Sequence, residues 1–159
     1  MRVTHQQLVE LVLPVLHTAC AEWQDYIREA IERGEGIELG RLDIGIATRW
    51  AVRDGHIECL KALLAVGLGQ AGIGNAAWVA SANGRVECLR LLIAVGLTRG
   101  DIDEAARWAT ICGRVECLKL LISAGLSQAG IDHADGLALI YCQCECQKLL
   151  EAARAKEEK

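Results

Sequence analysis

Apolar positions recur along the chain with a period longer than any single helix. The stretch GRVECLKLLISAGL at 113–126 is preceded by GRVECLRLLIAVGL at 84–97 and by GHIECLKALLAVGL at 55–68. In each copy the Leu, Ile and Val residues fall three and four positions apart, which predicts an amphipathic helix between two glycines. The central cysteine returns every 29 residues, at positions 59, 88, 117 and 146. A fixed period of this length indicates stacked structural repeats, because one such unit cannot bury its apolar face alone.

A second helix is predicted in front of each copy, and we call the two helix A and helix B in chain order. In the third unit, helix A reads LTRGDIDEAARWA over 97–109. We expect Asp101 to cap this helix, with Glu104 completing a capping box. Glycines then end the helix-B stretches in the left-handed conformation. Isoleucine and alanine return at equivalent helix-A positions, spaced so that they share one side: Ile44, Ile73, Ile102 and Ile131; Ala47, Ala76, Ala105 and Ala134; Ala51, Ala80, Ala109 and Ala138.

The predicted architecture is an all-α helical repeat solenoid that forms one structural domain. The units span 39–67, 68–96, 97–125 and 126–154, followed by a charged tail at 155–159. Residues 1–38 lie outside the repeat. Their apolar positions at helical spacing predict an N-terminal helical cap, which a solenoid needs because its first unit has an open apolar face.

Composition narrows the class of protein. With 52% hydrophobic residues in 159, the chain is not expected to be disordered. The formal net charge of −4 argues against a nucleic-acid-binding protein, which carries clustered Lys and Arg. No apolar run approaches the roughly 18 residues that a membrane span requires, and the N-terminus makes a poor signal peptide. We therefore expect a cytoplasmic protein.

At GHIECLKALLAVGL and ECLKLLISAGL the chain resembles ankyrin repeats, whose second helix follows the pattern GHxExxKxLLxxGA. The unit is shorter than the family's usual repeat of about 33 residues, and the Thr-Pro-Leu-His opening is missing, as in short, loop-poor variants. In the fourth unit Cys142 replaces the turn glycine, Gln147 a leucine and Arg154 the last glycine, as expected of a C-terminal cap. The resemblance implies a module that binds another protein. We also expect a monomer without enzymatic activity, cofactor or small-molecule substrate.

In such a solenoid the stacked A helices form a concave face, and its variable positions are the predicted partner contacts, together with the N-terminal cap. Trp78 is the leading candidate, with simple packing as the alternative, because it lies in a register shared with arginines, and aromatic and Arg residues dominate binding hot spots. Trp50 and Trp108 share the next register and are expected to pack between units instead. The predicted contacts are Ile46, Arg49, Arg53, Asn75, Trp78, Asn83, Glu104, Arg107, Ile111, His133 and Tyr141.

Cysteine suggests an alternative function, a metal or redox sensor built on Cys142, Cys144 and Cys146. Core packing is the favoured interpretation, because Cys146 shares the repeat position of Cys117 and Cys144 that of Val115. Alternate residues on a helix point to different sides, so we predict no metal site.

A second alternative is the non-catalytic targeting part of a larger effector or enzyme system. Helix B is expected to expose i,i+3 pairs: Glu58 with Lys61, Glu87 with Arg90, Glu116 with Lys119 and Glu145 with Lys148.

Overall fold

The structure is a computed structural model that describes residues 2–3, 29, 32–33, 37–38 and 41–157. It divides into two compact units, Met1–Gly72 and Ile73–Lys159. Most of the predicted N-terminal helical cap lies outside the described residues. Within it, strands β1 (Arg2–Val3) and β2 (Ile37–Glu38) pair antiparallel. Two-residue strands are too short to show an alternating pattern, so the sequence did not predict them.

The first unit also holds one helix pair, α3 (Arg41–Asp54) and α4 (Ile57–Val66), which pack against each other. Gly55 makes the turn between them with φ of 83°, a backbone conformation that glycine adopts without steric cost. Val52 on α3 and Leu60 on α4 are fully buried. This pair follows the predicted order of helix A, glycine turn and helix B.

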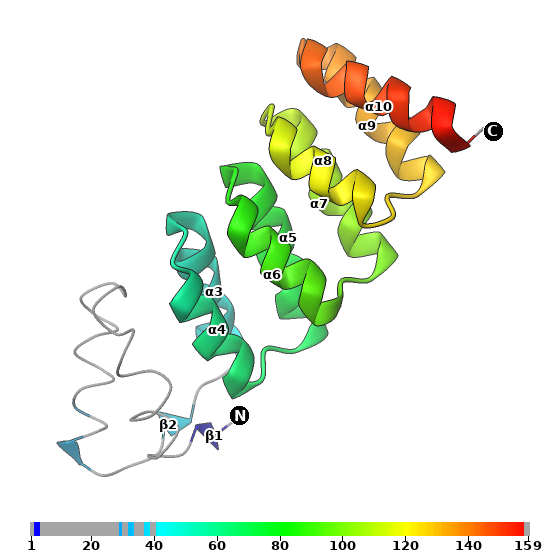
Figure 1. The fold of residues 1–159 in the computed structure, drawn as a ribbon. Helices are drawn as coiled ribbons and strands as arrows, with labels where there is room; N and C mark the ends of the chain where they lie inside the picture. Colours follow the sequence, from blue (N-terminus) through cyan, green and yellow to red (C-terminus); the bar gives the residue numbers. More distant parts are fainter. Residues whose placement is uncertain (1, 4–28, 30–31, 34–36, 39–40, 158–159) are drawn as a thin grey trace. The chain divides into compact units, whose positions relative to one another are not determined.

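The second unit contains three further pairs: α5 (Gln70–Asn83, from Ile73 on) with α6 (Val86–Gly96), α7 (Arg99–Ile111) with α8 (Val115–Ser123), and α9 (Gln128–Ile140) with α10 (Cys144–Glu157). Figure 1 shows these pairs in succession, with α7 against α9 and α8 between α6 and α10. Helices α5, α7 and α9 are the A helices. The prediction of an all-α repeat solenoid is confirmed.

Small and aliphatic side chains fill the core of the second unit, as the register predicted. The repeated alanines of the A helices, such as Ala105 and Ala134, are fully buried, and so are Leu89 and Leu118 of the B helices. Cys88, Cys117 and Cys146 are buried there, and Cys59 is buried in the first unit, which confirms the cysteine position as core. Because alanine adds only one methyl group, neighbouring A helices approach closely, and each buried leucine contributes about 1.5–3 kcal/mol.

The turn glycines meet a second requirement besides their positive φ. Gly84 (φ 70°) lies under the side chain of Arg114, which belongs to the next pair. Gly113 (φ 64°) lies under Gln143, so an added Cβ would be 2.5 Å from Gln143 Oε1. Each of these turns is therefore covered by the start of the following B helix. Cys142 takes the equivalent turn in the last pair at φ 55°, as a non-glycine residue.

The predicted cap of the third A helix is wrong by three residues. Thr98, not Asp101, is the N-cap, and Asp101 is the N3 residue of a complete capping box. The Thr98 hydroxyl accepts from Asp101 N at 3.2 Å, while Thr98 N donates to Asp101 Oδ2 at 3.0 Å. Both residues can cap, and the helix gains almost one more turn by starting at Thr98. The predicted left-handed glycines at the ends of the B helices, Gly67, Gly96 and Gly125, are confirmed.

The prediction that Cys144 faces inward is also wrong. Cys144 is the first residue of α10 and is exposed. The equivalent Val86 and Val115 each begin a B helix and are only half-buried. The first residue of a B helix comes before the residues that pack on the core. An apolar residue at this position is therefore no sign that its side chain is buried.

Candidate functional site

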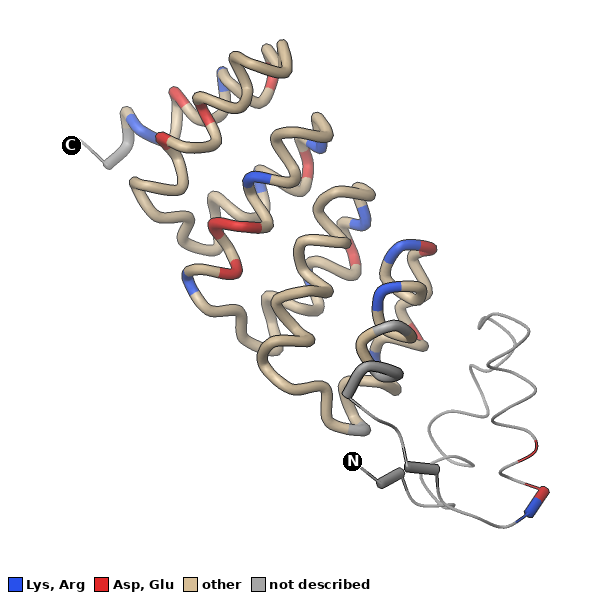
Figure 2. The backbone as a smooth tube through the Cα atoms, turned by 180° about the vertical axis from the view of Figure 1, so that it is seen from behind, with Lys and Arg blue, Asp and Glu red and all other residues tan. Residues whose placement is uncertain are grey.

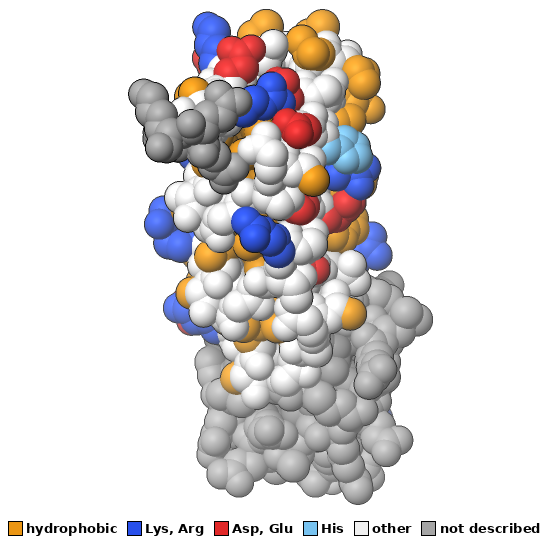
Figure 3. Space-filling view, turned by 90° about the vertical axis from the view of Figure 1, so that its right-hand side faces the viewer, with side chains coloured by type: hydrophobic (Ala, Val, Ile, Leu, Met, Phe, Trp, Pro, Cys, Tyr) orange, Lys and Arg blue, Asp and Glu red, His pale blue; other side chains and the backbone are white. Residues whose placement is uncertain are grey.

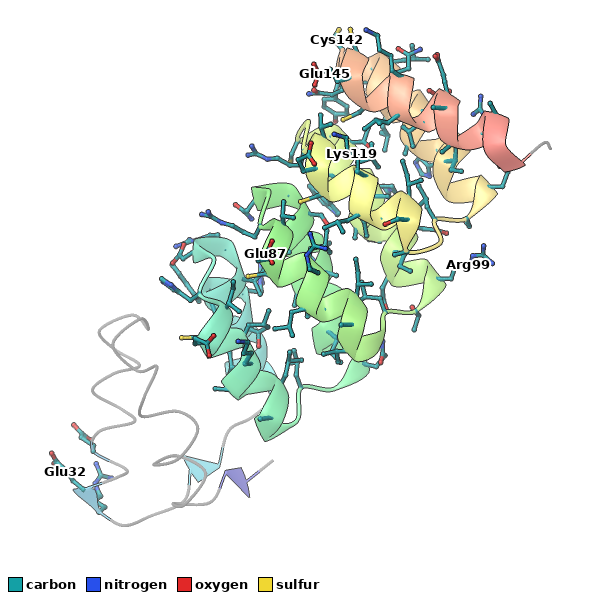
Figure 4. All side chains as sticks on the ribbon, viewed as in Figure 1. Glu32, Glu87, Arg99, Lys119, Cys142 and Glu145 are labelled. Atoms are coloured by element: carbon teal, nitrogen blue, oxygen red, sulfur yellow. The ribbon has the colours of Figure 1, made fainter. Side chains whose placement is uncertain are left out.

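The exposed side of the B helices is regular and solvated. Lys61 Nζ lies 2.7 Å from Glu58 Oε1, and Lys119 Nζ lies 2.7 Å from Glu116 Oε1. Glu87 and Arg90 form the equivalent, longer pair at 3.6 Å. The fourth predicted pair, Glu145 with Lys148, is not among the ion pairs of the described residues. In Figure 4 Glu87 and Lys119 lie on one open side of α6 and α8. Exposed ion pairs of this kind contribute little to the stability of the fold.

The A helices of the second unit present a different surface, centred on two tryptophans. Trp78 on α5 and Trp108 on α7 come from neighbouring pairs, with ring centroids 5.3 Å apart and planes inclined by 33°. Both side chains are half-buried. Trp78 Nε1 donates to Asn75 Oδ1 at 3.3 Å, which orients the indole. The result is a fixed aromatic pair that still reaches solvent.

Glu104 connects this aromatic pair to an arginine. Its Oε1 accepts from Trp108 Nε1 at 2.9 Å, and its Oε2 accepts from Arg107 Nη1 at 2.6 Å. The Arg107 Nε is buried and has no hydrogen-bond partner among the described residues. Each Glu104 oxygen accepts one hydrogen bond within this group, and the Arg107 guanidinium, which is a donor only, has further N–H groups.

We define the helix-A surface as Asn75, Trp78, Glu104, Arg107, Trp108 and His133. Asn75 and His133, which share the repeat position of Glu104, are exposed. Three other predicted contacts lie near the turns. Asn83 is exposed and donates to Val79 O at 2.8 Å, Ile111 is half-buried, and Tyr141 follows α9 with 49% of its surface exposed.

The remaining predicted contacts belong to the first unit. Arg49 and Arg53 on α3 are exposed, and the Arg53 guanidinium carbon lies 4.0 Å from the ring centroid of Trp50. Trp50 is 45% exposed. Arg53 Nε also donates to Asp54 Oδ1 at 2.9 Å. The side chain of Ile46 lies outside the described residues.

The cysteine run does not form a converging site. Cys142 and Cys144 are exposed, whereas Cys146 is buried in the core. Burial raises the pKa of the Cys146 and Cys88 thiols, and it raises the pKa of Cys117 from 9.0 to about 11. Such thiols remain protonated and unreactive at neutral pH. Among the described residues, no three His, Cys, Asp or Glu side chains are grouped to hold a metal ion.

Figure 2 marks the acidic cluster at the start of α7 in red. Its carboxylates have structural partners. Asp101 belongs to the capping box. Asp103 crosses to the next pair: its Oδ1 accepts from Ser127 N at 3.0 Å and its Oδ2 from Ser127 Oγ at 2.6 Å. Ser127 Oγ in turn accepts from Gly130 N at 2.9 Å and caps α9. Asp101 therefore caps its own helix, and Asp103 joins α7 to the next helix pair.

The structure repeats a pair of helices joined by a turn at a constant interval, with variable side chains on helix A. This arrangement is typical of a known class of repeat proteins. The family model described as ankyrin repeats (3 copies) matches residues 48–132. The chain belongs to the ankyrin-repeat family. No curated protein matches it significantly. Ankyrin repeats are generally protein–protein interaction modules and are typically non-catalytic. Among the described helices, none is both long and apolar enough to cross a bilayer.

In this ankyrin-repeat chain, Trp108 packs between neighbouring repeats, as the sequence predicted, because its ring contacts Trp78 of the preceding pair. What sequence reasoning missed is that Trp78 is its partner and that both rings remain partly exposed. A signal was available: Trp78 and Trp108 fall one register apart on adjacent A helices. Sequence reasoning also overlooked Leu139 and Ile140 at the end of α9, which are among the most exposed large apolar residues described.

Proposed function

We propose that the chain binds a protein partner through the helix-A surface of its second unit. The contact between Trp78 and Trp108 supports this most directly. A rigid aromatic pair loses little conformational freedom on binding, and tryptophan and arginine are enriched in the residues that dominate interface energy. The pair stays half-exposed, so a partner can bury more of it.

Contrast between the two sides of the repeats adds support. The B helices repeat the same Glu–Lys or Glu–Arg pair, which carries no information about a particular partner. On the A helices, equivalent positions carry Asn75, Glu104 and His133. Repeat proteins combine a constant core with variable exposed positions, so that specificity changes while stability is kept.

The chemistry of the helix-A surface favours a partner with both apolar and acceptor groups. Trp78 and Trp108 offer ring faces, and Arg107 offers N–H groups beyond the one bonded to Glu104. An adaptor, an effector and an inhibitor would all use such a surface. The proposal includes a contribution from the N-terminal cap, and it assigns the chain no catalysis of its own.

The test is comparative affinity capture. Tagged wild-type protein and the variants Trp78→Ala, Arg107→Ala and His133→Ala are used as bait, and the captured proteins are compared by mass spectrometry. We expect one partner to be lost or weakened with the Trp78 and Arg107 variants. The matched controls, Arg90→Ala and Lys119→Ala on the B helices, should keep it.

Folding must be measured for the same variants. Loss of the ring contact costs Trp78→Ala about 0.5–1.5 kcal/mol beyond its lost burial. His133 is exposed, so His133→Ala should leave the melting temperature unchanged while it weakens capture. If no partner responds to the helix-A variants, or if the helix-B variants respond equally, the proposed surface is wrong.

A further inference from the structure

Two thiols around the start of α10 differ from the cysteines of the repeated core position. Cys142 and Cys144 are free and exposed, whereas the cysteines of the core position are buried. Figure 4 labels Cys142 in the turn between α9 and α10. In Figure 3 side chains of the apolar class, which includes cysteine, come to the surface over this last helix pair. Core packing therefore explains neither exposed thiol.

The backbone at Cys142 is unfavourable for a residue that carries a side chain. Its φ of 55° lies in the left-handed region, and the two preceding turns of the second unit have glycine at this position. Cys144 likewise stands where the two preceding B helices begin with valine. A strained residue that adds nothing to the core is a reason to look for a function. Here both departures from the repeat introduce a thiol.

The turn before α10 has the same backbone as the turn before α8. Gln143 N donates to Ala138 O at 2.8 Å. In the preceding pair Arg114 N makes the equivalent bond to Ala109 O at 2.7 Å. Residues two apart within a helix point to different sides, but Cys142 lies in the turn before the helix begins. The helical rule therefore does not separate the two thiols.

This backbone brings the first and third residues of the turn together. In the turn before α8, Val115 N donates to Gly113 O at 3.2 Å, and the residue between them has φ of −89° and ψ of 76°. These dihedrals are close to those of an inverse γ-turn, which folds three residues back on themselves. Cys142 and Cys144 occupy the first and third positions before α10, and Cys144 Sγ lies 3.8 Å from Cys142 O. The Cys144 side chain is thus already turned toward Cys142.

We infer that Cys142 and Cys144 form a redox-active dithiol, which a small-molecule disulfide converts reversibly to an intramolecular disulfide. One cysteine thiolate attacks a sulfur of the small disulfide, breaks its S–S bond and releases one reagent thiolate. The second cysteine thiolate attacks the protein sulfur of the mixed disulfide, forms the S–S bond between the cysteines and releases the other reagent thiolate. The two protein thiols are oxidised, and the reagent is reduced to two thiols that take up the two protons.

The buried thiols do not compete for this reaction. Burial raises the pKa of Cys88, Cys117 and Cys146, so these thiols stay protonated at neutral pH. Cys146 also lies two residues beyond Cys144 on the same helix and is buried in the core. Access and spacing together therefore select the two exposed thiols.

The disulfide acts at the contact between the last two helix pairs. Gln143, the residue between the thiols, covers Gly113 of the preceding turn. Closing the ring in the native turn fixes Gln143 there and so stabilises the docking of α9 and α10. Exposed disulfides are labile, as reversible regulation requires. This inference does not depend on the proposed helix-A surface.

The test is equilibrium oxidation in mixtures of reduced and oxidised glutathione. Free and bonded thiols are alkylated in turn and located by tandem mass spectrometry, for the folded protein and for the chain unfolded in urea. The strain intrinsic to the small ring is common to both states. A preorganised turn should therefore give the folded protein a ring-closing constant at least about tenfold larger, which converts to a gain in unfolding free energy of about 1.4 kcal/mol on oxidation.

The variants Cys142→Gly and Cys144→Val introduce the residues of the preceding pair, so both should fold. Neither should form the disulfide, and oxidation should leave their unfolding midpoints unchanged. Cys112→Ser is the matched control, because it removes a half-buried thiol after α7 and should oxidise like the wild type.

Four outcomes overturn the proposal. The first is a disulfide that involves any other cysteine of the chain, and the second is a disulfide between two copies. The third is a mixed glutathione disulfide that accumulates without closing the ring. The fourth is a ring-closing constant of the folded protein that falls short of the tenfold ratio to the unfolded chain.

Discussion

Asp103 offers the sharpest test of how the helix pairs are joined. Its carboxylate accepts two hydrogen bonds from Ser127, 24 residues away and in the next pair. Gly130 makes room for it, since an added Cβ there would lie 2.5 Å from Asp103 Oδ1. The substitution Asp103→Ala removes both acceptors and leaves the Ser127 cap of α9 without its anchor.

The expected loss follows from these two contacts. Hydrogen bonds to a charged acceptor contribute about 1.5–3 kcal/mol each when the alternative is an unpaired buried group. Asp103 and Ser127 are half-buried, so water replaces part of the loss, and we expect a decrease in unfolding free energy of about 2 kcal/mol. For a protein of this size the melting temperature should fall by about 4–8 °C.

The assay combines denaturant unfolding with amide hydrogen exchange. Because stability in a repeat protein depends on contacts between neighbouring helix pairs, protection of the amides from exchange should fall mainly in α9 and α10. A double-mutant cycle of Asp103→Ala with Ser127→Ala should show a coupling energy of at least about 0.5 kcal/mol. Asp103→Asn retains one acceptor and should be intermediate.

Glu116→Ala is the matched control, because it removes an exposed carboxylate paired with Lys119 at 2.7 Å and should cost no more than about 0.5 kcal/mol. The reasoning fails if Asp103→Ala is no more destabilising than this control. It also fails if the two substitutions in the cycle are additive, or if exchange quickens evenly over the whole second unit.

Three further outcomes are expected. Gly113→Ala should lower the free energy of unfolding by at least about 1 kcal/mol, seen as a lower denaturation midpoint. Alanine is strained at φ 64°, and its methyl group would crowd Gln143. An unchanged midpoint would contradict this. Cys142→Gly should raise stability by up to about 1 kcal/mol in the same assay, since it relieves a non-glycine residue at φ 55°, and a loss would show that the thiol has a packing role. Burial raises the pKa of Cys117 from 9.0 to about 11, so between these values the folded form keeps a proton that the unfolded chain has lost. Unfolding free energy should therefore fall as pH rises through this window, and the fall should be shallower in Cys117→Ala.

Much of the fold could be read from the register of small and apolar residues. Cys88, Cys117 and Cys146 were assigned to the core because they share one position of the repeat, and all are buried. Gly96 and Gly125 were assigned to helix ends for the same reason, and both have positive φ. A period shows which residues are equivalent, and equivalent residues in stacked units meet similar surroundings.

The candidate site was less predictable. The variable positions Trp78 and Arg107 could be found from sequence, but not the hydrogen bonds that tie Glu104 to Arg107 and to Trp108. Those bonds depend on side-chain rotamers and on the offset between neighbouring helices, which a single repeat does not encode. Whether these residues contact a partner remains a prediction for the capture experiment.

Local signals also failed where two residues could play the same part. Thr98 and Asp101 are both good caps, and the choice depended on where α7 gains its first turn. Cys144 looked like core because Val115 shares its position, yet the first residue of a B helix precedes the buried stripe.

The sequence by itself determined the repeat, the helix pairs, the glycine turns and the residues that fill the core, because these follow from periodicity and backbone preference within one unit. Only the tertiary structure decided how Asp103 reaches Ser127, how Trp78 meets Trp108 and why Leu139 is exposed where Thr110 is buried. These features depend on the rise and rotation from one helix pair to the next. Packing between whole helices sets that geometry, so it cannot be read from any single residue of the sequence.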